Sequence, residues 1–407
     1  MGTYGLLGEK LGHSFSPQIH RLLGGYDYRL IEVAPDALDD FMRSADFDGL
    51  NVTIPYKKAV VPYCAELSPR AAALGNVNTI VRRPDGSLYG DNTDYCGFET
   101  LVRASGISVA GTKCAVLGSG GASCTAQAVL RDLGAAQVLC ISRSGVYNYT
   151  DISPWQDADI LVNATPVGMY PGNGSAPVDI AQLPGCRAVF DLIYNPARTR
   201  LMLDAEARNI PAFGGLLMLV AQARAAAELF TGRSFGDDCV RRIAGQLAVQ
   251  TGNIILIGMA GCGKTSVGKA LARRTGREFV DTDELFEEKA GISIPRYFSL
   301  YGEAAFRRLE TRVLTDVTRR SGLIIATGGG VVTQPENLPL LKQNGIVVWL
   351  RRPVADLPSD GRPMSQMHTP AALYEARKDL YAAWSDFAFD NDAVTETAEN
   401  IQKELRL

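Results

Sequence analysis

Two segments of this chain, far apart in the sequence, each run from an apolar strand through a glycine-rich loop into a helical pattern. They span residues 113–133 and 253–276. This order is typical of a parallel sheet in which a strand delivers its loop to the N-terminus of a helix, where backbone N–H groups can hold a phosphate. Further short apolar runs lie between them, at residues 137–141, 160–163 and 188–191. We therefore predict an α/β protein with two separate nucleotide-binding folds.

The boundary between these folds is predicted near residue 250. A helical stretch at 214–230 ends near Gly232, and apolar residues then follow the i, i+3, i+4, i+7 spacing of a second helix at 237–249. Thr251 and Gly252 interrupt that pattern. We predict a first domain over residues 1–250 and a second over 251–407, joined by a short connection.

Composition excludes several classes of partner. The 41 Lys and Arg residues against 44 Asp and Glu give a net charge of −3, and no basic tract is present, so we expect no nucleic-acid partner. The eight cysteines form no Cys-x-x-Cys pair and only three histidines occur, which favours reduced thiols and no structural metal.

The most apolar stretch, 216–230, holds Gln222, Arg224 and Glu228 and is too polar to span a bilayer. With no signal segment at the N-terminus, we expect a cytoplasmic protein without a membrane partner. The oligomeric state stays open.

The first glycine loop is predicted to hold a dinucleotide, because glycine lets the backbone approach a pyrophosphate closely. The residues expected at this cofactor are Gly118, Ser119, Gly120, Gly121 and Ala122 in the loop, and Ser142, Arg143 and Ser144 after the next strand. An NAD site usually places Asp or Glu after that strand, whereas the guanidinium of Arg143 suits a 2′-phosphate. We therefore predict NADP(H) rather than NAD. A solvated arginine in a surface loop is the alternative.

Polar residues from four separate segments of the first half suggest one pocket. They are Ser14, Ser16, Asn51, Thr53, Lys57, Asn78 and Asp94. Singly, each could belong to a turn, but together their hydroxyls and amides suit a polyhydroxylated small molecule. Lys57 and Asp94 are the only strongly titratable pair among them, which makes them the candidates for proton transfer.

The first half resembles the shikimate dehydrogenase family. The resemblance rests on Ser-Phe-Ser-Pro at 14–17, Asn-Val-Thr-Ile-Pro-Tyr-Lys at 51–57, Asn-Thr-Asp at 92–94, Asn-Ala-Thr-Pro-Val-Gly-Met at 163–169 and Leu-Val-Ala-Gln at 219–222. It implies that the polar residues above bind a cyclohexene acid together with Tyr194 and Gln222, and that Gly215 contributes to the cofactor site. It also implies a substrate subdomain over 1–103 plus 214–250 and a Rossmann-like NADP-binding subdomain over 104–213.

The resemblance assigns the proton chemistry of the first half to Lys57 and Asp94. An ammonium held against a carboxylate can polarise a carbonyl and supply the proton that follows a hydride. A free lysine titrates near about 10.4, so Lys57 acts either as an electrostatic clamp or with a lowered proton affinity. The chain departs from the family at Tyr95-Cys96, where a glycine is frequent, and at residues 142–144, where Asn-Arg-Thr is more usual.

The second glycine loop satisfies the pattern Gly-x-x-x-x-Gly-Lys-Thr at residues 258–265. In this P-loop, backbone N–H groups cradle the β-phosphate of ATP, Lys264 reaches the β and γ oxygens, and the Thr265 hydroxyl ligates Mg²⁺. The residues expected at the nucleotide are Gly261, Cys262, Gly263, Lys264, Thr265 and Ser266.

The rest of the second half supplies a further set of charged and glycine residues. Residues 252–407 resemble shikimate kinase through Asp281 and Asp283, the Gly-Glu-Ala-Ala-Phe-Arg run at 302–307, the glycines at 328–330, Asp-Gly-Arg-Pro at 360–363 and the segment 374–381. The resemblance implies that the acceptor is bound by Asp283, Arg307, Gly329 and Arg377, that Asp281 assists Mg²⁺, and that Arg362 closes onto the transferred phosphate. Lys264 and Asp283 join Arg362 as catalytic candidates. The stretch 351–361 is shorter and richer in proline than this family would suggest, which bears on lid closure and ATP affinity.

The two resemblances together predict one bifunctional enzyme of aromatic amino acid biosynthesis. Its first half would reduce 3-dehydroshikimate with NADPH, and its second would phosphorylate the resulting shikimate with ATP and Mg²⁺. One alternative is a dehydrogenase that prefers quinate or uses NAD. Another is a metabolite-sensing pseudoenzyme that binds these molecules without turnover.

Overall fold

The computed structural model describes residues 2–12, 14–236, 238–357 and 369–407. The chain divides into two compact units. The first comprises Met1–Gly168, Ser175–Tyr194 and Asp204–Gln246; the second comprises Met169–Gly174, Asn195–Leu203 and Leu247–Leu407. Two short segments that precede residue 250 thus group with the second unit, and each unit is described by itself below.

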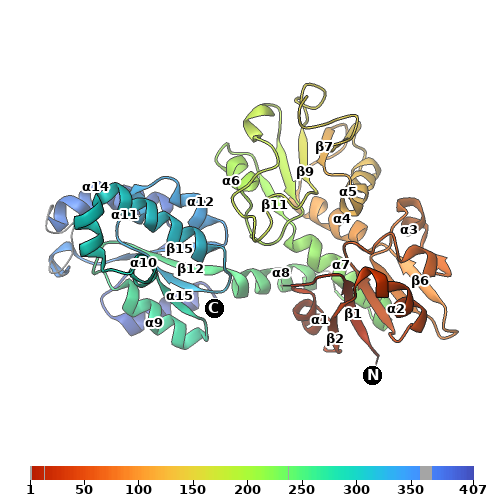
Figure 1. The fold of residues 1–407 in the computed structure, drawn as a ribbon, viewed down its shortest axis with the longest axis horizontal. Coiled ribbons are helices and arrows are strands. Elements are labelled where there is room, and N and C mark those ends of the chain that lie inside the picture. The colour runs from red at the N-terminus through yellow and green to blue at the C-terminus, as the bar shows by residue number, and fades with distance from the viewer. Residues whose placement is uncertain (1, 13, 237, 358–368) are drawn as a thin grey trace. The chain divides into compact units, whose positions relative to one another are not determined.

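The first unit opens with a six-stranded sheet in the order β2-β1-β3-β5-β6-β4 (Figure 1). Its strands are β1 (Tyr4–Gly8), β2 (Tyr28–Glu32), β3 (Gly49–Val52), β4 (Glu66–Leu67), β5 (Thr79–Arg82) and β6 (Leu88–Asp91). The sequence pattern suggested parallel sheets, but this one is mixed, since β5 runs antiparallel to both β3 and β6. The reason is local: a tight turn joins β5 to β6, and Gly86 takes the left-handed conformation that it needs, with φ 85°.

Helices of the first unit position the candidate residues at the ends of these strands. They are α1 (Ser16–Gly24), α2 (Leu38–Ser44), α3 (Pro69–Leu74), α4 (Asp94–Ser105) and α7 (Leu216–Thr231), with η1 (Pro35–Ala37) and η2 (Val61–Tyr63) between them. The helix predicted at 214–230 is confirmed as α7, which ends at Gly232 with φ 66°. Helices α4 and α7 lie against each other because Gly97 carries no side chain, and a Cβ there would approach the Met218 carbonyl oxygen at 2.7 Å.

The second sheet of this unit has five parallel strands in the order β11-β10-β9-β7-β8. Its elements are β7 (Lys113–Leu117), α5 (Gly121–Asp132), β8 (Gln137–Ile141), β9 (Ile160–Asn163), η3 (Ile180–Gln182), β10 (Ala188–Asp191), α6 (Arg200–Glu206) and β11 (Ala212–Gly214). The strands predicted at 137–141, 160–163 and 188–191 are confirmed. All residues of β9 and β10 are buried, as expected of central strands in a parallel sheet covered on both faces.

Helix α8 (Asp238–Thr251) carries the chain from the first unit into the second, and only Gly252 separates it from strand β12. The third sheet is again fully parallel, in the order β13-β14-β12-β15-β16. Its strands are β12 (Asn253–Ile257), β13 (Phe279–Asp281), β14 (Ile324–Ala326), β15 (Gly345–Arg351) and β16 (Phe387–Asp390). The predicted α/β class with parallel sheets is thereby confirmed.

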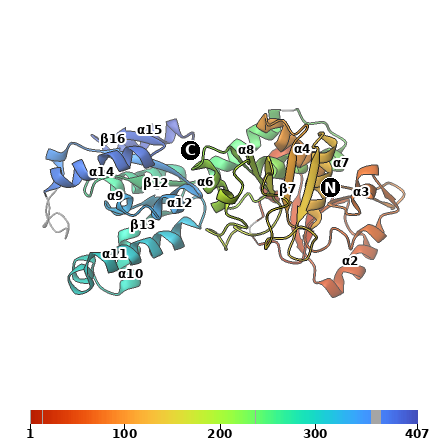
Figure 2. The same ribbon diagram turned by 90° about the horizontal axis from the view of Figure 1, so that it is seen from above.

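The helices of the second unit surround this sheet. They are α9 (Lys264–Thr275), α10 (Thr282–Ala290), α11 (Ile294–Thr318), α12 (Asn337–Lys342), α14 (Pro370–Trp384) and α15 (Val394–Glu404), with η4 (Val331–Thr333) and η5 (Val354–Asp356). Figure 2 shows α10 and α11 together at the β13 end of the sheet and α15 at the β16 end. Gly302, with φ 74°, interrupts α11 and so sets the direction of the turn that carries Arg307.

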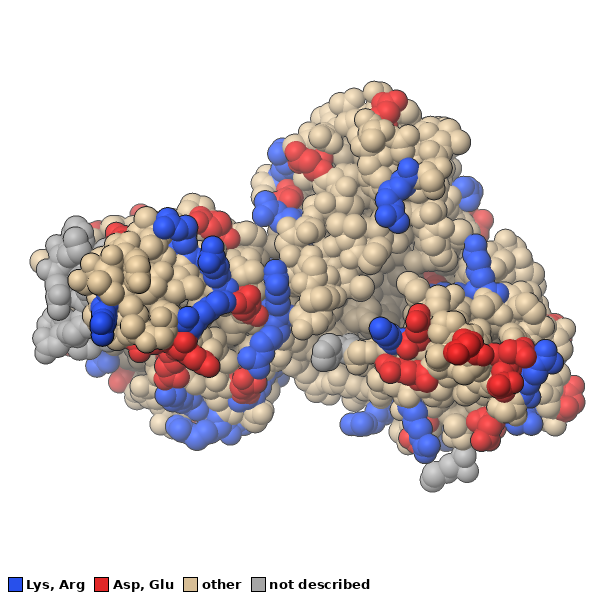
Figure 3. All heavy atoms as spheres, viewed as in Figure 1, with Lys and Arg blue, Asp and Glu red and all other residues tan. Residues whose placement is uncertain are grey.

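The surface carries charges of both signs. On the face in Figure 3, acidic side chains gather over η1 and α2, where Asp36, Asp39 and Asp40 lie, and basic ones are scattered among uncharged atoms. In the described part of the chain, no helix combines the length and apolar character that a membrane span requires.

Candidate active sites

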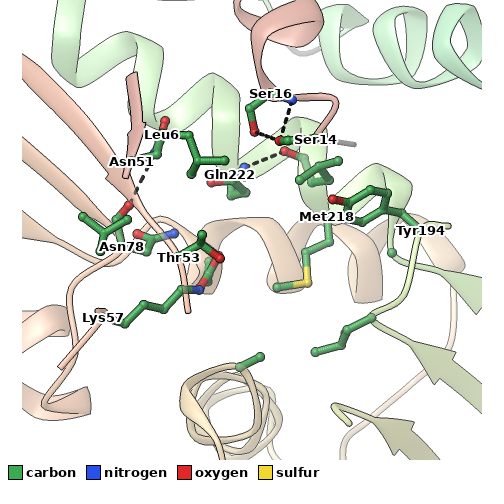
Figure 4. A pocket seen from close by; sticks show the side chains of 16 residues that line it. Leu6, Ser14, Ser16, Asn51, Thr53, Lys57, Asn78, Tyr194, Met218 and Gln222 are labelled. Carbon is green, nitrogen blue, oxygen red and sulfur yellow. Dashed lines mark hydrogen bonds and ion pairs between the residues drawn. The ribbon is translucent and has the colours of Figure 1, made fainter. Parts of the chain in front are cut away.

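A cavity of about 210 Å³ in the first unit collects every side chain predicted to bind substrate in the first half (Figure 4). It is lined by Leu6, Ser14, Ser16, Asn51, Val52, Thr53, Lys57, Asn78, Asp94, Ala122, Leu192, Tyr194, Gly215, Met218, Leu219 and Gln222. Ser14 and Ser16 come from the start of α1 and the residues just before it, Asn51, Thr53 and Lys57 from β3 and the loop after it, and Asn78 from the residue before β5. Asp94 comes from the start of α4, Tyr194 from the loop after β10 and Gln222 from α7. Sequence reasoning missed the apolar wall of Leu6, Met218 and Leu219, which a non-polar ring face can contact.

Lys57 and Asp94 form an ion pair within this cavity, and their side chains are 18% and 10% exposed. Among the described residues that line the cavity, they are the only ones with a full charge. Asp94 is the first residue of α4, where the helix dipole favours a carboxylate. The cavity therefore presents a partly dehydrated proton donor and its counter-ion to an otherwise neutral polar pocket.

Hydrogen bonds within the protein determine which ends of two pocket groups face the ligand. Ser14 Oγ accepts from the Ser16 backbone N–H at 3.2 Å and donates to Ser16 Oγ at 3.2 Å, which leaves the Ser16 hydroxyl proton for the cavity. Gln222 Nε2 donates to the carbonyl oxygen of Leu219 at 2.9 Å, so Oε1 is the end left for the ligand. A pocket with donors near Ser16 and an acceptor at Gln222 suits a carboxylate at one place and a hydroxyl at the other.

Asn51 lies in the cavity wall, but its amide is bonded to protein at both ends. Its Oδ1 accepts from the Tyr28 hydroxyl at 2.8 Å, and its Nδ2 donates to Thr79 Oγ1 at 3.2 Å. Tyr28 stacks on the His20 ring, and burial lowers the pKa of His20 to about 3, so this imidazole is neutral. Sequence reasoning missed Tyr28 and His20, because only the folded chain brings them behind the pocket.

The glycine loop between β7 and α5 has the backbone that a dinucleotide requires. Gly118 has φ 104°, and a Cβ on it would lie 3.0 Å from the carbonyl oxygen of Ala164. Gly120 faces open space, with no atom within 4 Å of the position a Cβ would take. Gly121 opens helix α5, and its Cβ position lies 3.7 Å from Cδ of Lys57. The predicted pyrophosphate loop is therefore adjacent to the predicted proton donor.

The remaining cofactor candidates of the first half lie outside the cavity wall or take part in packing. Arg143 is exposed just after β8 and, in the described part of the chain, has no hydrogen-bond partner, so its guanidinium can meet a phosphate. Ser142 is buried and donates its N–H to the Tyr147 carbonyl at 3.0 Å, whereas Ser144 is exposed. Gly215 lines the cavity, and packing alone requires a glycine there, since a Cβ would lie 2.2 Å from the Leu192 carbonyl oxygen.

A second cavity, of about 430 Å³, lies in the second unit. It is lined by Met259, Ala260, Thr265, Asp281, Asp283, Glu284, Glu287, Ile294, Pro295, Phe298, Phe306, Arg307, Glu310, Gly328, Gly329, Gly330, Leu357, Pro370, Leu373 and Arg377. The predicted acceptor-binding residues Asp283, Arg307, Gly329 and Arg377 therefore meet in one place. Arg362 lies outside the described residues, as do residues 358–361 of the segment that departs from the family pattern.

The P-loop forms one wall of this second site. Gly261 and Gly263 have φ of 84° and 97°, and Lys264 is buried, donating from Nζ to the carbonyl oxygens of Gly258 and Met259 at 2.9 and 2.8 Å. Asn391, which sequence reasoning missed, donates to the Cys262 carbonyl at 2.7 Å. These bonds hold the loop open in the conformation that turns its N–H groups toward a phosphate.

Two oxygen donors at the start of α9 and the end of β13 fit a Mg²⁺ ion. Thr265 Oγ1 donates to Asp281 Oδ2 at 2.7 Å, and Asp281 also accepts from the Asp283 N–H at 3.0 Å as the N-cap of α10. A hydroxyl and a carboxylate are hard ligands of the kind that Mg²⁺ takes in P-loop proteins, where water and phosphate complete its shell. Asp281 therefore caps α10 with one carboxylate oxygen and keeps the other bonded to Thr265.

Asp283 lines the cavity. The residue as a whole is exposed to solvent, but its carboxylate is surrounded by many protein atoms. Burial, followed by the negative charge of Asp281, raises its pKa to about 6. A carboxylate that titrates close to neutral pH can accept a proton from a hydroxyl more readily than an ordinary aspartate.

Arg307 is held by Glu310, a residue that sequence reasoning missed. The Arg307 guanidinium contacts Glu310 at 2.8 Å, and the two side chains are 7% and 5% exposed. Burial raises the pKa of Glu310, although Arg307 opposes that shift. Glu310 follows Arg307 by three residues on α11, and this helical spacing is the signal that could have revealed the pair.

Three consecutive glycines after β14 let these groups converge. A Cβ on Gly330 would lie 2.4 Å from Nη1 of Arg307, and one on Gly328 would lie 2.7 Å from Oε1 of Glu310. The carbonyl of Gly329 accepts from Arg377 at 3.3 Å and also from the Tyr381 hydroxyl. The strand end therefore fixes both arginines around one part of the cavity.

Comparison with known proteins finds two families along the chain. A model described as the shikimate dehydrogenase substrate binding domain matches residues 6–80, and one described as shikimate kinase matches residues 260–406. The shikimate dehydrogenase (NADP(+)) of Clostridium beijerinckii is 38% identical over 252 residues, which are 56% of this chain and 92% of that protein. The shikimate kinase of Burkholderia lata is 45% identical over 147 residues, 34% of this chain and 80% of that protein.

Solved structures give the same result for the first half. Shikimate dehydrogenase 1 from Peptoclostridium difficile matches with a TM-score of 0.58 and 32% identity, over 61% of this chain and 98% of that one. The Thermus thermophilus shikimate 5-dehydrogenase, solved in complex with NADP(H) and shikimate, matches with a TM-score of 0.55 and 30% identity, over 60% and 99%.

Proposed function

This chain belongs to both the shikimate dehydrogenase family and the shikimate kinase family, and we propose that it performs the two reactions in sequence. The first unit reduces 3-dehydroshikimate to shikimate with NADPH, and the second phosphorylates shikimate to shikimate 3-phosphate with ATP. The hydroxyl that reduction creates is the one that is phosphorylated.

In the first unit, Lys57 and Asp94 carry the proton chemistry. The loop at Gly118–Gly121 would hold NADPH, with Arg143 at its 2′-phosphate, and the cofactor bound there would supply the hydride for the carbonyl carbon. Lys57 donates its Nζ proton to the carbonyl oxygen as the hydride arrives, and Asp94 stabilises the ammonium before transfer and holds Nζ in place. Ser14, Ser16 and Gln222 bind the carboxylate and hydroxyls of the ring.

In the second unit, Asp283 accepts the proton of the acceptor hydroxyl as that oxygen bonds to the γ-phosphorus and ADP leaves. Lys264 neutralises charge on the β and γ oxygens, and Arg307 and Arg377 hold the shikimate carboxylate. Mg²⁺ held by Thr265 and Asp281 would neutralise the phosphate oxygens. Glu310 keeps Arg307 in position.

The observation that supports this assignment best is the Lys57–Asp94 ion pair in a neutral polar cavity beside the glycine loop. A binding protein gains little from an ion pair placed there, because the pair must be dehydrated when the ligand enters. For a reductase, the same pair is the proton source that the reaction needs.

A coupled assay tests the whole proposal. Purified protein is given 3-dehydroshikimate, NADPH, ATP and Mg²⁺, and NADPH oxidation and the phosphate ester are followed together. We expect one equivalent of NADPH oxidised for each ester formed. No oxidation and no ester would contradict the proposal and favour a sensor, and a higher kcat/KM for quinate or NAD would change the assigned substrate or cofactor.

A further inference from the structure

A row of buried side chains, joined by hydrogen bonds, lies behind the cavity of the first unit. Three of these residues take no direct part in the proposed reaction: Tyr28, Thr79 and Thr93. The Tyr28 hydroxyl donates to Asn51 Oδ1 at 2.8 Å, and Asn51 Nδ2 donates to Thr79 Oγ1 at 3.2 Å. Thr79 Oγ1 lies 2.9 Å from Thr93 Oγ1. The row ends at Asn78, which Figure 4 shows beside Asn51 on one wall of the cavity.

The row fixes the orientation of the Asn78 amide. Its Oδ1 lies 2.7 Å from the backbone nitrogen of Thr93, a group that can only donate. The hydroxyls of Thr79 and Thr93 lie 3.1 and 3.2 Å from the same oxygen. Oδ1 is therefore an acceptor for protein groups, and Nδ2, which has no protein partner in the described chain, is left for the cavity.

Asn51 fixes the direction of the row from the other end. Its Nδ2 also faces the carbonyl oxygen of Asn78 at 3.5 Å, so this end of the amide is the donor. The Thr79 oxygen thus accepts a hydrogen bond from Asn51. Its own hydroxyl can donate one hydrogen bond, either to Thr93 or to Asn78. In both arrangements Asn78 Oδ1 remains an acceptor and its NH₂ group faces the ligand.

We propose that Thr79 is a positioning residue for the reduction, which holds Asn78 with its NH₂ group turned to the substrate. Thr79 is fully buried and does not line the cavity, so it acts on the substrate through Asn78. The consequence for specificity is that the ligand must place an acceptor oxygen against Asn78. A molecule with an amino group at that position would place its own N–H donors against the NH₂ group of Asn78. Neither group would have an acceptor, so the molecule binds poorly. This inference rests on the proposed reductase function.

The test compares Thr79→Val, which replaces the hydroxyl by a methyl of similar shape, with Thr79→Ser, which keeps the hydroxyl. In Thr79→Val we expect KM for 3-dehydroshikimate to rise roughly tenfold, because Asn51 and Thr93 lose a shared partner and Asn78 is held less firmly, by Thr93 alone. We expect kcat and KM for NADPH to stay near the wild-type values, and Thr79→Ser to restore the substrate KM. A general loss of structure would instead change all of these parameters together.

A double-mutant cycle separates an action through Asn78 from an independent effect. In an Asn78→Ala background, Thr79→Val should add no further rise in KM. Asn78→Asp provides a test that leaves Thr79 in place, since it keeps the acceptor for Thr93 but replaces the cavity-facing donor by an acceptor; we expect a raised substrate KM.

An unchanged KM in Thr79→Val or Asn78→Asp, or additive effects in the cycle, would overturn the inference. A wild-type protein that does not oxidise NADPH with this substrate would instead contradict the proposed function, and the inference with it.

Discussion

At the residue scale, charge and burial act together on single groups in both cavities. Lys57 and Asp94 lie next to each other in a pocket that holds no other full charge among its described residues. Burial, followed by the negative charge of Asp281, raises the pKa of Asp283 to about 6. The first arrangement places a proton donor beside its counter-ion, while the second turns an ordinary acid into a base that titrates near neutral pH.

The raised pKa of Asp283 predicts the pH dependence of phosphorylation. The carboxylate must be ionised to accept a proton, so we expect the rate to fall as the pH drops through about 6. Asp283→Asn should lower kcat by roughly 100-fold or more, the usual contribution of a general base. The check is a pH profile of ester formation from shikimate; a wild-type rate that stays constant from pH 8 to 5 would contradict the role.

The same group predicts a change in stability. Since the folded pKa of Asp283 lies above its ordinary 3.8, the folded state binds more protons between those values, and this group destabilises the fold increasingly as pH rises through about 6. Asp283→Asn should therefore raise the melting temperature at pH 8 and have less effect at pH 5. Thermal unfolding at both pH values checks this, and an equal shift at both would be against it.

At the scale of elements, close packing of helices places side chains from distant segments around one cavity. Helix α4 begins at Asp94 and α7 carries Met218 and Gln222, and the two helices meet at Gly97. Because Gly97 has no side chain, α4 and α7 can approach closely, and this approach determines the width of the pocket that both helices line.

Gly97→Ala should accordingly impair both stability and reduction. The added Cβ would lie 2.7 Å from the Met218 carbonyl oxygen and 3.0 Å from Cβ of Gln222, so α7 must shift. We expect a loss of about 1–3 kcal/mol in unfolding free energy and a raised KM for 3-dehydroshikimate. The matched control is Gly245→Ala in α8, where no atom lies within 4 Å of the new methyl. That change should stabilise the protein by about 0.5–1 kcal/mol, and equal effects of the two changes would count against the packing argument.

At the scale of the whole molecule, each compact unit contains its own candidate active-site cavity. Every residue that lines the first cavity belongs to the first unit, and every residue that lines the second belongs to the second unit. The two sets of site residues therefore have no member in common. A shared chain keeps the two sites at a high mutual concentration without requiring that the intermediate pass directly between them.

This separation predicts that each activity can be removed alone. Lys57→Ala should lower NADPH oxidation by about 100-fold to 10,000-fold, the range for a lost proton donor, and leave phosphorylation of shikimate unchanged. Lys264→Ala should abolish the ester and spare NADPH oxidation. Separate steady-state assays of both variants check this; loss of both activities in either variant would mean that the units are coupled.

The sequence by itself determined the fold class, the two glycine loops and the types of residue in both sites. It could do so because strand–loop–helix units and short motifs are held together by contacts between near neighbours. Tertiary structure decided the rest. The antiparallel pairing of β5 with the distant strand β3, the contact between α4 and α7 at Gly97 and the burial that raises the pKa of Asp283 all depend on segments that meet only after folding. The direction in which Asn78 presents its amide depends likewise on Thr93 and Thr79, because a hydrogen bond has a direction that no local pattern of residues records.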